Sequence, residues 1–280
     1  MAVSRRARRI VLAAALVVVA LGIGLLLSPS HRAYYTGVGQ GVARDAVGAV
    51  RAVALPAVGT AAIGTRRRVL VPDAEGLRVP ISDEPPFRLP ALGTPVGWEL
   101  REFSGRAEVE LVRGDRGLAV HLRAERASFA LYRDLVVGLD EFPALGWSWK
   151  IARLPTGGDV RQAARDDQAA QVYVMFPRWP SPKTQSDVIG YVWDTTAPVG
   201  TTLRSTKAAN VRIIVVESGQ ERLGVWRRQW RNVAQDYRTL FGRAAPRVGA
   251  IAVMIDSNDT LSAAEATVGD LIFARAMPKE

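Results

Sequence analysis

The residues that could carry chemistry gather between two aromatic-rich runs. The stretch from Trp147 to Pro177 places a polar loop, Leu154 to Gln168, between two segments in which apolar and polar residues alternate. The loop holds three carboxylates, Asp159, Asp166 and Asp167. Paired carboxylates serve as acid and base in glycoside hydrolysis when about 5–10 Å separates them. Adjacent residues of an extended segment point to opposite sides, so Asp166 and Asp167 are a poor pair by themselves. Salt bridges to arginines of the same loop are the alternative.

Aromatic residues close to these carboxylates suit the binding of a sugar, because a flat ring can stack on a pyranose while polar groups fix its hydroxyls. Trp179 lies in FPRWPSP, where prolines and charges favour exposure. Tyr173, Tyr191 and Trp193 alternate with valines, so these rings either line a concave face or fill the core. The candidate ligand-binding residues are Lys150, Asp159, Asp166, Asp167, Trp179, Tyr191 and Trp193.

A second group of oxygen-bearing side chains follows an apolar run, in the sequence DSNDT from Asp256 to Thr260. Carboxylate and amide oxygens are the ligands that calcium takes. The spacing departs from an EF-hand loop, because Thr260 and Leu261 stand where Asp or Asn and then Gly are needed. A turn built on Asp and Asn at the end of a strand is the alternative. The candidate residues for a structural calcium ion are Asp256, Asn258 and Asp259, and no other cofactor is expected.

Two scarce residue types narrow the chemistry further. The chain has no cysteine and only two histidines, His31 and His121. Thiol catalysis and thiolate metal sites are therefore excluded. With one histidine after Phe87, a two-histidine zinc site cannot form in that region, and a Ser-His-Asp triad has a single candidate centre. This scarcity favours binding over catalysis, with a carboxylate-based enzyme as the alternative.

The elements that must position these residues are mostly strands. From Phe87 onwards, short alternating runs follow one another at the spacing typical of an antiparallel β-sandwich. In one of them Trp147 and Trp149 share a side, which predicts that both are core residues. The expected strands are Ala107 to Val112, Leu118 to Ala124, Ser128 to Tyr132, Leu145 to Ile151, Gln171 to Phe176, Val188 to Trp193, Val211 to Glu217, Gly249 to Ile255 and Thr267 to Phe273.

One segment, Glu221 to Gly242, has the period of a helix. Its apolar residues recur at steps of three or four, which indicates one stripe of an amphipathic helix that lies across the sandwich. The stripe consists of Leu223, Trp226, Trp230, Val233, Tyr237 and Phe241. Gly242 followed by Pro246 would end this helix.

The N-terminus reads MAVSRRARR and is followed by eighteen uncharged, almost wholly apolar residues from Ile10 to Leu27. At about 1.5 Å per residue this run is just long enough to cross a bilayer core, so we expect a transmembrane signal-anchor. A signal peptide cleaved near Ser30 is the alternative. Four arginines precede the run and one closely follows it, which predicts a cytoplasmic N-terminus and a remainder outside the cytoplasm.

The expected organisation is that of a single-pass protein of the cytoplasmic membrane. Residues 1–9 form a basic cytoplasmic segment, 10–27 the span, 28–86 a tether rich in Gly and Pro, and 87–280 the β-sandwich domain. The domain would face the periplasm or the exterior, and a cleaved leader would leave it free in the periplasm.

The net charge of +10 does not indicate nucleic-acid binding. The first 72 residues contain ten Arg, no Lys and one acidic residue, whereas the remainder has 27 basic and 26 acidic residues. Polyanion binding requires Lys and Arg clustered on a folded surface. The basic excess lies beside the predicted span, where a membrane surface explains it.

A string of motifs resembles the bacterial domain-of-unknown-function family number 3047. The motifs are WSWK, GGD and ARDDQAAQVYVMF, then YVWDTT, VVESG, RNVAQDYRTLFG and MIDSNDT, in this order. The resemblance covers roughly Phe87 to the C-terminus. It implies an exported bacterial domain with a jelly-roll-like β-sandwich similar to galactose-binding and carbohydrate-binding modules. It implies no established activity and no catalytic residues.

Together these features predict a membrane-anchored, extracytoplasmic module that binds a glycan or another envelope ligand without catalysis. The alternatives are a carboxylate-based enzyme acting on envelope polysaccharide and a structural or protein-interaction module of the envelope. The predicted partners are the membrane, through the N-terminal helix, and the glycan.

Overall fold

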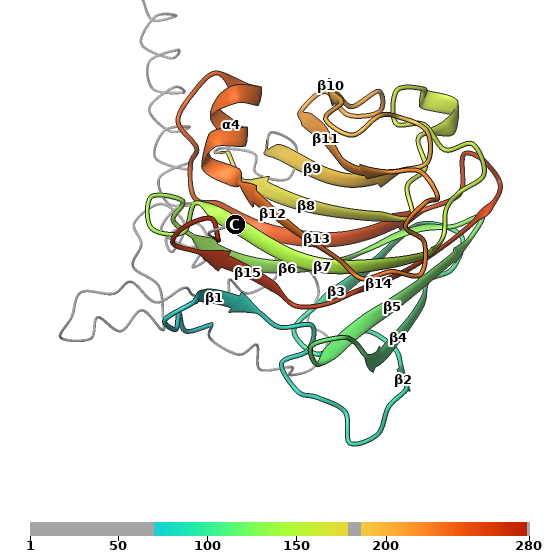
Figure 1. Cartoon of the computed structure of the whole chain (residues 1–280), viewed down its shortest axis with the longest axis horizontal. Helices are drawn as coiled ribbons and strands as arrows, with labels where there is room; N and C mark the ends of the chain where they lie inside the picture. Colours follow the sequence, from blue (N-terminus) through green and yellow to red (C-terminus); the bar gives the residue numbers. More distant parts are fainter. Residues whose placement is uncertain (1–69, 179–185, 279–280) are drawn as a thin grey trace, which may run out of the picture.

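The computed structural model describes residues 70–178 and 186–278. In these residues fifteen strands form one eight-stranded and one seven-stranded sheet, which enclose a single large apolar core. The long strands are strongly curved, α4 (Val233–Phe241) lies at one end of them, and β10 lies beside β11 at the edge of its sheet (Figure 1). The prediction of an all-β-dominated sandwich is therefore confirmed.

The eight-stranded sheet has the order β1-β15-β7-β14-β5-β4-β2, and β12 pairs with the other edge of β7. Its strands are β1 (Gly76–Val79), β2 (Ala91–Leu92), β4 (Glu108–Arg113), β5 (Leu118–Glu125), β7 (Ala144–Arg153), β12 (Arg227–Asn232), β14 (Ala263–Val268) and β15 (Leu271–Ala274).

The seven-stranded sheet has the order β10-β11-β9-β8-β13-β6-β3. Its strands are β3 (Glu99–Ser104), β6 (Ser128–Val137), β8 (Ala170–Phe176), β9 (Asp187–Asp194), β10 (Thr202–Arg204), β11 (Val211–Ser218) and β13 (Val248–Asp256). The sheet departs from the predicted antiparallel arrangement at one pair, because β11 runs parallel to β9. The chain reverses into β10 and then again into β11, and two reversals restore the direction of β9.

Aromatic rings fill the space between the sheets. Trp147 and Trp149 on β7 pack edge to face with their ring centroids 5.4 Å apart, and Trp147 also lies 5.4 Å from Tyr191 on β9. Trp149 meets Trp193 at 6.1 Å. All four side chains are buried, so the prediction that both β7 tryptophans are core residues is confirmed.

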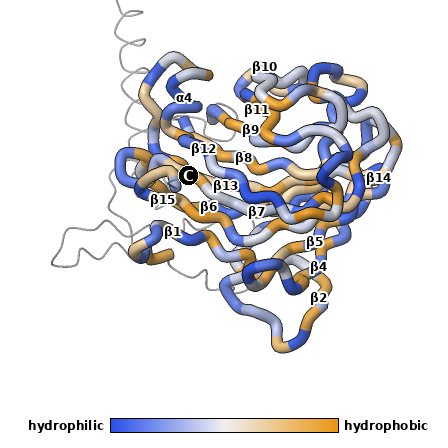
Figure 2. The backbone as a smooth tube through the Cα atoms, viewed as in Figure 1, coloured by the Kyte–Doolittle hydropathy of each residue, from blue (hydrophilic) through white to orange (hydrophobic). Residues whose placement is uncertain are grey.

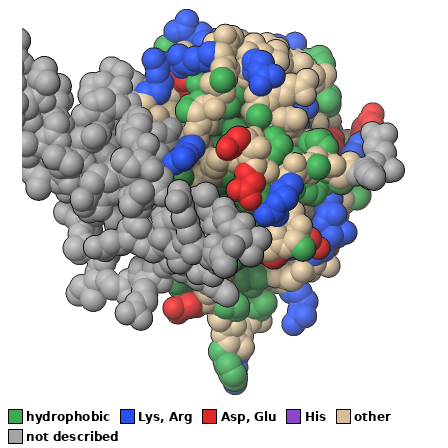
Figure 3. Space-filling model, turned by 90° about the vertical axis from the view of Figure 1, so that its left-hand side faces the viewer, with side chains coloured by type: hydrophobic (Ala, Val, Ile, Leu, Met, Phe, Trp, Pro, Cys, Tyr) green, Lys and Arg blue, Asp and Glu red, His purple; other side chains and the backbone are tan. Residues whose placement is uncertain are grey.

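The hydropathy of the chain follows this layering. In Figure 2 the hydrophobic segments gather in the central strands, whereas α4 and the connecting loops are largely hydrophilic. Figure 3, seen from the side that faces left in Figure 1, shows Lys and Arg gathered along the upper edge and acidic side chains near the middle of the visible surface beside further basic ones.

The prediction of a helix over Glu221 to Gly242 is wrong in its first half. Residues Arg227–Asn232 form β12, and the helix α4 begins at Val233, where the Asn232 side chain accepts a hydrogen bond from the Gln235 backbone N–H at 3.0 Å. Trp226 and Trp230 are four residues apart, a spacing that places them on one side of either a helix or a strand. The segment forms a strand and not a helix because β12 pairs along its full length with the edge of β7.

Two further boundaries differ from the sequence interpretation. The run Thr267 to Phe273 is divided between β14 and β15 by an irregularity at Gly269 and Asp270, and both strands pair antiparallel with β7. The sandwich also includes β1, which lies before Phe87 and pairs with β15.

The predicted span at residues 10–27 and most of the predicted tether lie outside the described residues. Within 70–178 and 186–278, no helix has the length and apolar character needed to cross a membrane.

Candidate functional site

The outward side of the seven-stranded sheet carries the best candidate site. In β8, Val172 and Val174 belong to the core, so Gln171 and Tyr173 between them point outward. The ladders place Tyr132 of β6, Ala252 of β13, Tyr173 of β8 and Gly190 of β9 in one row across the sheet. We call this surface the Tyr173 face and define it by Tyr132, Gln171, Tyr173, Met254 and Asp256.

A glycine positions the ring of Tyr173. A Cβ atom at Gly190 would lie 2.6 Å from the Tyr173 Cε1 atom and 2.8 Å from the Ile213 Cδ1 atom, so these side chains occupy the space that a larger residue would need. On its β9 side Tyr173 therefore packs closely against the backbone of the sheet. Its other neighbour in the row, Ala252, is also small.

Part of the outward side is covered by the loop between β7 and β8. Val160 of this loop and Ala197 join a second apolar cluster with Val192, Ile213 and Val215. The Asp194 carboxylate holds the loop in place, because it accepts hydrogen bonds from the backbone N–H groups of Val160 at 2.8 Å and Ala197 at 2.6 Å. The β7–β8 loop thus forms one wall of the Tyr173 face.

The carboxylates of the two predicted sites lie together at one end of this face. Asp167 accepts hydrogen bonds from the backbone N–H groups of Asp259 at 3.1 Å and Thr260 at 2.6 Å, and it joins the loop after β7 to the loop after β13. Asp166 accepts from Gln168 at 3.0 Å and Thr206 at 3.1 Å. Lys207 pairs with Asp259. Residues far apart in the sequence therefore build one polar cluster.

Two carboxyl groups of this cluster hold their protons more tightly than usual. Burial and the neighbouring Asp167 carboxylate raise the pKa of Asp256 to about 8. Burial also raises the pKa of Asp166. Both groups lie near Tyr173, whose phenol pKa is raised by burial and by their negative charges. At neutral pH Asp256 is therefore largely a neutral acid that can donate a hydrogen bond.

Gln171, which lies beside Tyr173, has an amide donor without a hydrogen-bond partner in the part of the chain that the structure describes. Its Oε1 atom accepts a hydrogen bond from the Tyr173 hydroxyl at 2.5 Å. Its Nε2 atom is buried and has no hydrogen-bond partner among the described residues. A buried amide without a partner costs about 1–3 kcal/mol, so such a group is normally satisfied by a ligand or by water.

The other predicted ligand-binding residues do not join this cluster. Asp159 lies in the β7–β8 loop but is occupied by Arg161, whose hydrogen bonds hold the carboxyl pKa well below its usual range. Tyr191 and Trp193 fill the core and offer no face to a ligand. Lys150 lies on the outward side of the opposite sheet, 5.6 Å from the Trp226 ring centre.

Trp179 lies outside the described residues. For a metal ion, the described part of the chain contains no group of three or more His, Asp or Glu side chains placed to hold one. Asp259 pairs instead with Lys207 and accepts from the Asn258 amide at 3.0 Å. Calcium binding by Asp256, Asn258 and Asp259 stays a prediction.

Several residues of the site were missed by the sequence reasoning. Gln171, Thr206 and Lys207 carry no local pattern that separates them from ordinary polar residues. The alternation of β8 does give Gln171 and Tyr173 the same side, and this signal could have identified them together.

The fold and the site define a two-sheet β-sandwich domain with a polar and aromatic outer sheet face. The chain belongs to the family described as "Protein of unknown function (DUF3047)", whose model matches residues 96–272. The predicted family is thus confirmed. No match was found among curated protein sequences.

Solved structures with a similar arrangement include sugar-binding and sugar-cleaving proteins. A family 11 carbohydrate-binding module from Clostridium thermocellum, in complex with a β-1,3-1,4-mixed-linked tetrasaccharide, has a TM-score of 0.40 at 10% identity, covering 73% of this chain and 100% of its own. The endoglucanase Cel12A from Rhodothermus marinus has 0.37 at 12% identity, with coverages of 65% and 98%. The xyloglucanase domain of NopAA from Sinorhizobium fredii has 0.36 at 11% identity, with coverages of 66% and 97%. These TM-scores carry no conclusion about ligand or reaction.

Proposed function

We propose that this protein is a non-catalytic module that binds a glycan or a similar hydroxyl-rich ligand on its Tyr173 face. The single observation that carries the proposal is the buried, unpaired Nε2 of Gln171 beside the Tyr173 ring. A ligand hydroxyl that accepts from Gln171 would satisfy this donor while the ring of the ligand lies against Tyr173.

The neighbouring carboxyl groups complete the proposed binding surface. Asp256, neutral at pH 7, donates its proton to Asp167 and can accept from a ligand hydroxyl through its other oxygen, and Asp166 can also accept from a hydroxyl. A sugar offers both kinds of partner on adjacent carbons. The mixture of a donor amide, a neutral acid and a flat ring therefore suits hydroxyl groups better than it suits a purely apolar or a strongly charged ligand.

The test is retention of the full-length chain, in mild detergent, on an array of bacterial envelope glycans and plant oligosaccharides. Calorimetry with the best-retained oligosaccharide should then show roughly 2- to 10-fold weaker binding for Gln171→Leu, the loss of one hydrogen bond. Tyr173→Ala should weaken binding further, because it removes both the ring and the hydroxyl that orients Gln171.

The matched control is Arg238→Gln, on the exposed side of α4, which should leave the affinity unchanged. Circular dichroism of each variant separates lost binding from lost folding. The proposal is wrong if no glycan is retained, or if folded Gln171→Leu and Tyr173→Ala variants bind as well as the wild type.

A second candidate is hydrolysis of a glycosidic bond by Asp166 and Asp256. The observation that favours it is that both carboxyls have raised pKa values and lie near the same tyrosine. A carboxyl group that stays protonated near neutral pH is what a general acid requires. Release of reducing ends from envelope polysaccharides, abolished by Asp256→Asn, would support it, and a binding signal without product would exclude it for those substrates.

We further propose that the module acts outside the cytoplasm, held at the membrane by residues 10–27. The apolar run and its flanking arginines support this placement. Fusion of a periplasm-dependent reporter to the C-terminus should give activity, and carbonate washing should leave the full chain in the membrane fraction. Reporter activity only in a cytoplasmic orientation would refute it.

A further inference from the structure

A small basic pocket lies on the outward side of the eight-stranded sheet, away from the Tyr173 face. The ladders place Arg78 of β1, Ile272 of β15, Gly146 of β7 and Trp230 of β12 in one row across this sheet. Arg228 of β12 lies in the neighbouring row, opposite the buried Ser148 of β7. We call this the Arg228 pocket.

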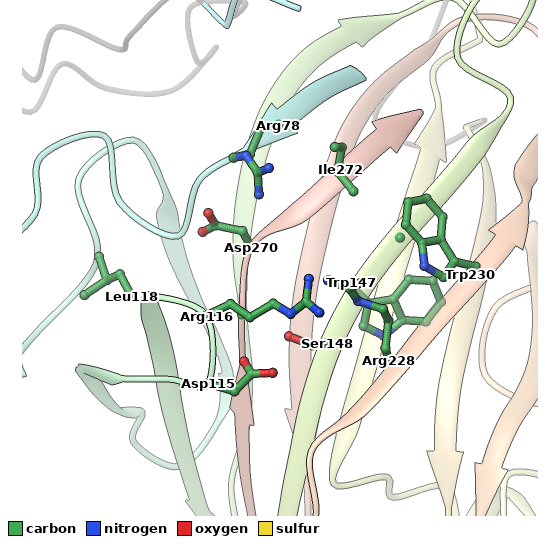
Figure 4. A pocket seen from close by; sticks show the side chains of 13 residues that line it. Arg78, Asp115, Arg116, Leu118, Trp147, Ser148, Arg228, Trp230, Asp270 and Ile272 are labelled. Carbon is green, nitrogen blue, oxygen red and sulfur yellow. The ribbon is translucent and has the colours of Figure 1, made fainter. Parts of the chain in front are cut away.

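Glycine again makes room for an aromatic ring. A Cβ atom at Gly146 would lie 2.7 Å from two carbons of the Trp230 indole, so the indole rests directly over the β7 backbone. Trp230 is half-buried and forms one side of the pocket, next to Ile272 (Figure 4). The row therefore offers an apolar platform beside charged groups.

Three guanidinium groups from different elements line the pocket. Arg78 comes from β1, Arg228 from β12, and Arg116 from the turn between β4 and β5 (Figure 4). Arg116 and Arg228 are exposed and have no carboxylate partner within the described ranges. Arg78 pairs with the exposed Glu75 at 2.9 Å. A surface ion pair of this kind contributes little to stability, so an anionic ligand can replace Glu75 as the partner of Arg78.

The pocket contains less negative charge than positive charge. Asp115 and Asp270 are its carboxyl groups, and Asp270 already accepts a hydrogen bond from the Ile81 backbone N–H at 2.9 Å. Guanidinium groups without carboxylate partners bind carboxylate or phosphate oxygens through paired N–H donors. The chemistry of the pocket therefore favours an anion.

Its size limits what can enter. The cavity has a volume of about 70 Å³, roughly the space that two water molecules take in the liquid. One carboxylate or phosphate group fits, whereas a whole sugar ring does not. The remainder of the ligand must lie outside, where Trp230 is the adjacent flat surface.

We propose that the Arg228 pocket binds the anionic group of an acidic sugar, with the sugar ring lying against Trp230. Arg116 and Arg228 hold the carboxylate or phosphate, and the indole provides the apolar contact. This site goes beyond the proposed function, because it lies on the opposite sheet and selects a sugar that carries a negative charge. A ligand that carries both neutral and acidic sugars could contact either face.

The test is calorimetry of the full-length chain in mild detergent at low salt with two acidic probes, tetragalacturonate and glucose 6-phosphate. The first presents carboxylates and the second a phosphate, so the two arms distinguish the source of the anion. Maltotetraose and glucose are the neutral counterparts. We expect at least one acidic probe to bind more tightly than its neutral counterpart, with an affinity that falls as salt is added.

The diagnostic variant is Arg116→Gln combined with Arg228→Gln, which should weaken acidic-probe binding about tenfold or more. Both side chains are exposed and unpaired, so folding should be unaffected. The charge-matched control is Arg165→Gln, on the β7–β8 loop, combined with Arg238→Gln, on α4, and it should change the affinity less than twofold.

Three results would overturn the proposal: neither acidic probe binds, the neutral counterparts bind equally well, or the variant with Arg116→Gln and Arg228→Gln binds the acidic probes as well as the charge-matched control does. Its failure is separable from that of the proposed function, because the Tyr173→Ala variant should retain acidic-probe binding.

Discussion

The raised pKa of Asp256 predicts a measurable pH dependence of stability. The carboxyl has a pKa of about 8 in the folded protein and about 3.9 in an unfolded chain. Between these values the folded state binds a proton at this site that the unfolded state has lost. The contribution of this proton to the stability of the folded state is therefore fully present below pH 4 and is lost as the pH rises to 8.

The magnitude follows from the linkage relation. Each pH unit in this interval lowers the free energy of unfolding through this one group, by roughly 3 kcal/mol in total between pH 5 and pH 7. Asp256→Asn removes the titration, and its amide can still donate to Asp167 as the protonated acid does. The variant should thus gain roughly 3 kcal/mol relative to the wild type over this range.

Urea unfolding of both proteins at pH 5, 6 and 7, followed by circular dichroism, measures this difference. Taking the difference between the two proteins cancels the other titrating groups. The control is Asp115→Asn, an exposed carboxyl in the turn before β5, for which the difference should stay constant within about 0.5 kcal/mol. A constant difference for Asp256→Asn, or one that grows in favour of the wild type, would refute the reasoning.

Three further predictions concern packing and buried contacts. Gly146→Ala should destabilise the domain by about 1–3 kcal/mol, because the new methyl group would meet the Trp230 indole at 2.7 Å; the double variant with Trp230→Ala should show a smaller additional loss in denaturant unfolding. Tyr191→Phe should cost about 1–3 kcal/mol in the same assay, since it removes a buried 2.9 Å hydrogen bond to a carboxylate. Asp83→Ala should cost about 3–5 kcal/mol, because Arg133 is buried and loses an ion pair of 2.7 Å; a loss below 1 kcal/mol would contradict this.

Local patterns in the sequence were sufficient for most of the sandwich. The alternation of β5, β7, β8 and β13 marks strands whose one side is buried, and the structure has each of them within a residue or two of the predicted bounds. The same patterns gave a wrong prediction at β12. The four-residue spacing of Trp226 and Trp230 fits both a helix and a strand, and the strand that pairs with β12, β7, lies about eighty residues earlier in the chain.

For the candidate site too, the sequence identified individual residues but not which of them lie together. The sequence singled out Asp166, Asp167, Asp256 and Asp259 as two separate sets, one for a ligand and one for calcium. The structure joins them, because Asp167 accepts hydrogen bonds from the backbone of the loop that follows β13. The structure also excludes Tyr191 from the candidate site, because its buried ring packs in the core.

By itself the sequence determined most of the long strands of this domain, the burial of the β7 tryptophans and the family. These depend on side-chain periodicity and on ordered motifs, which are local properties of the chain. Only the tertiary structure decided that Gln171 lies unpaired beside Tyr173, that Asp256 holds its proton, and that Arg116 and Arg228 meet at Trp230. Each of these depends on which strands become neighbours in a sheet and on how deeply a group is buried, and no window of sequence contains that information.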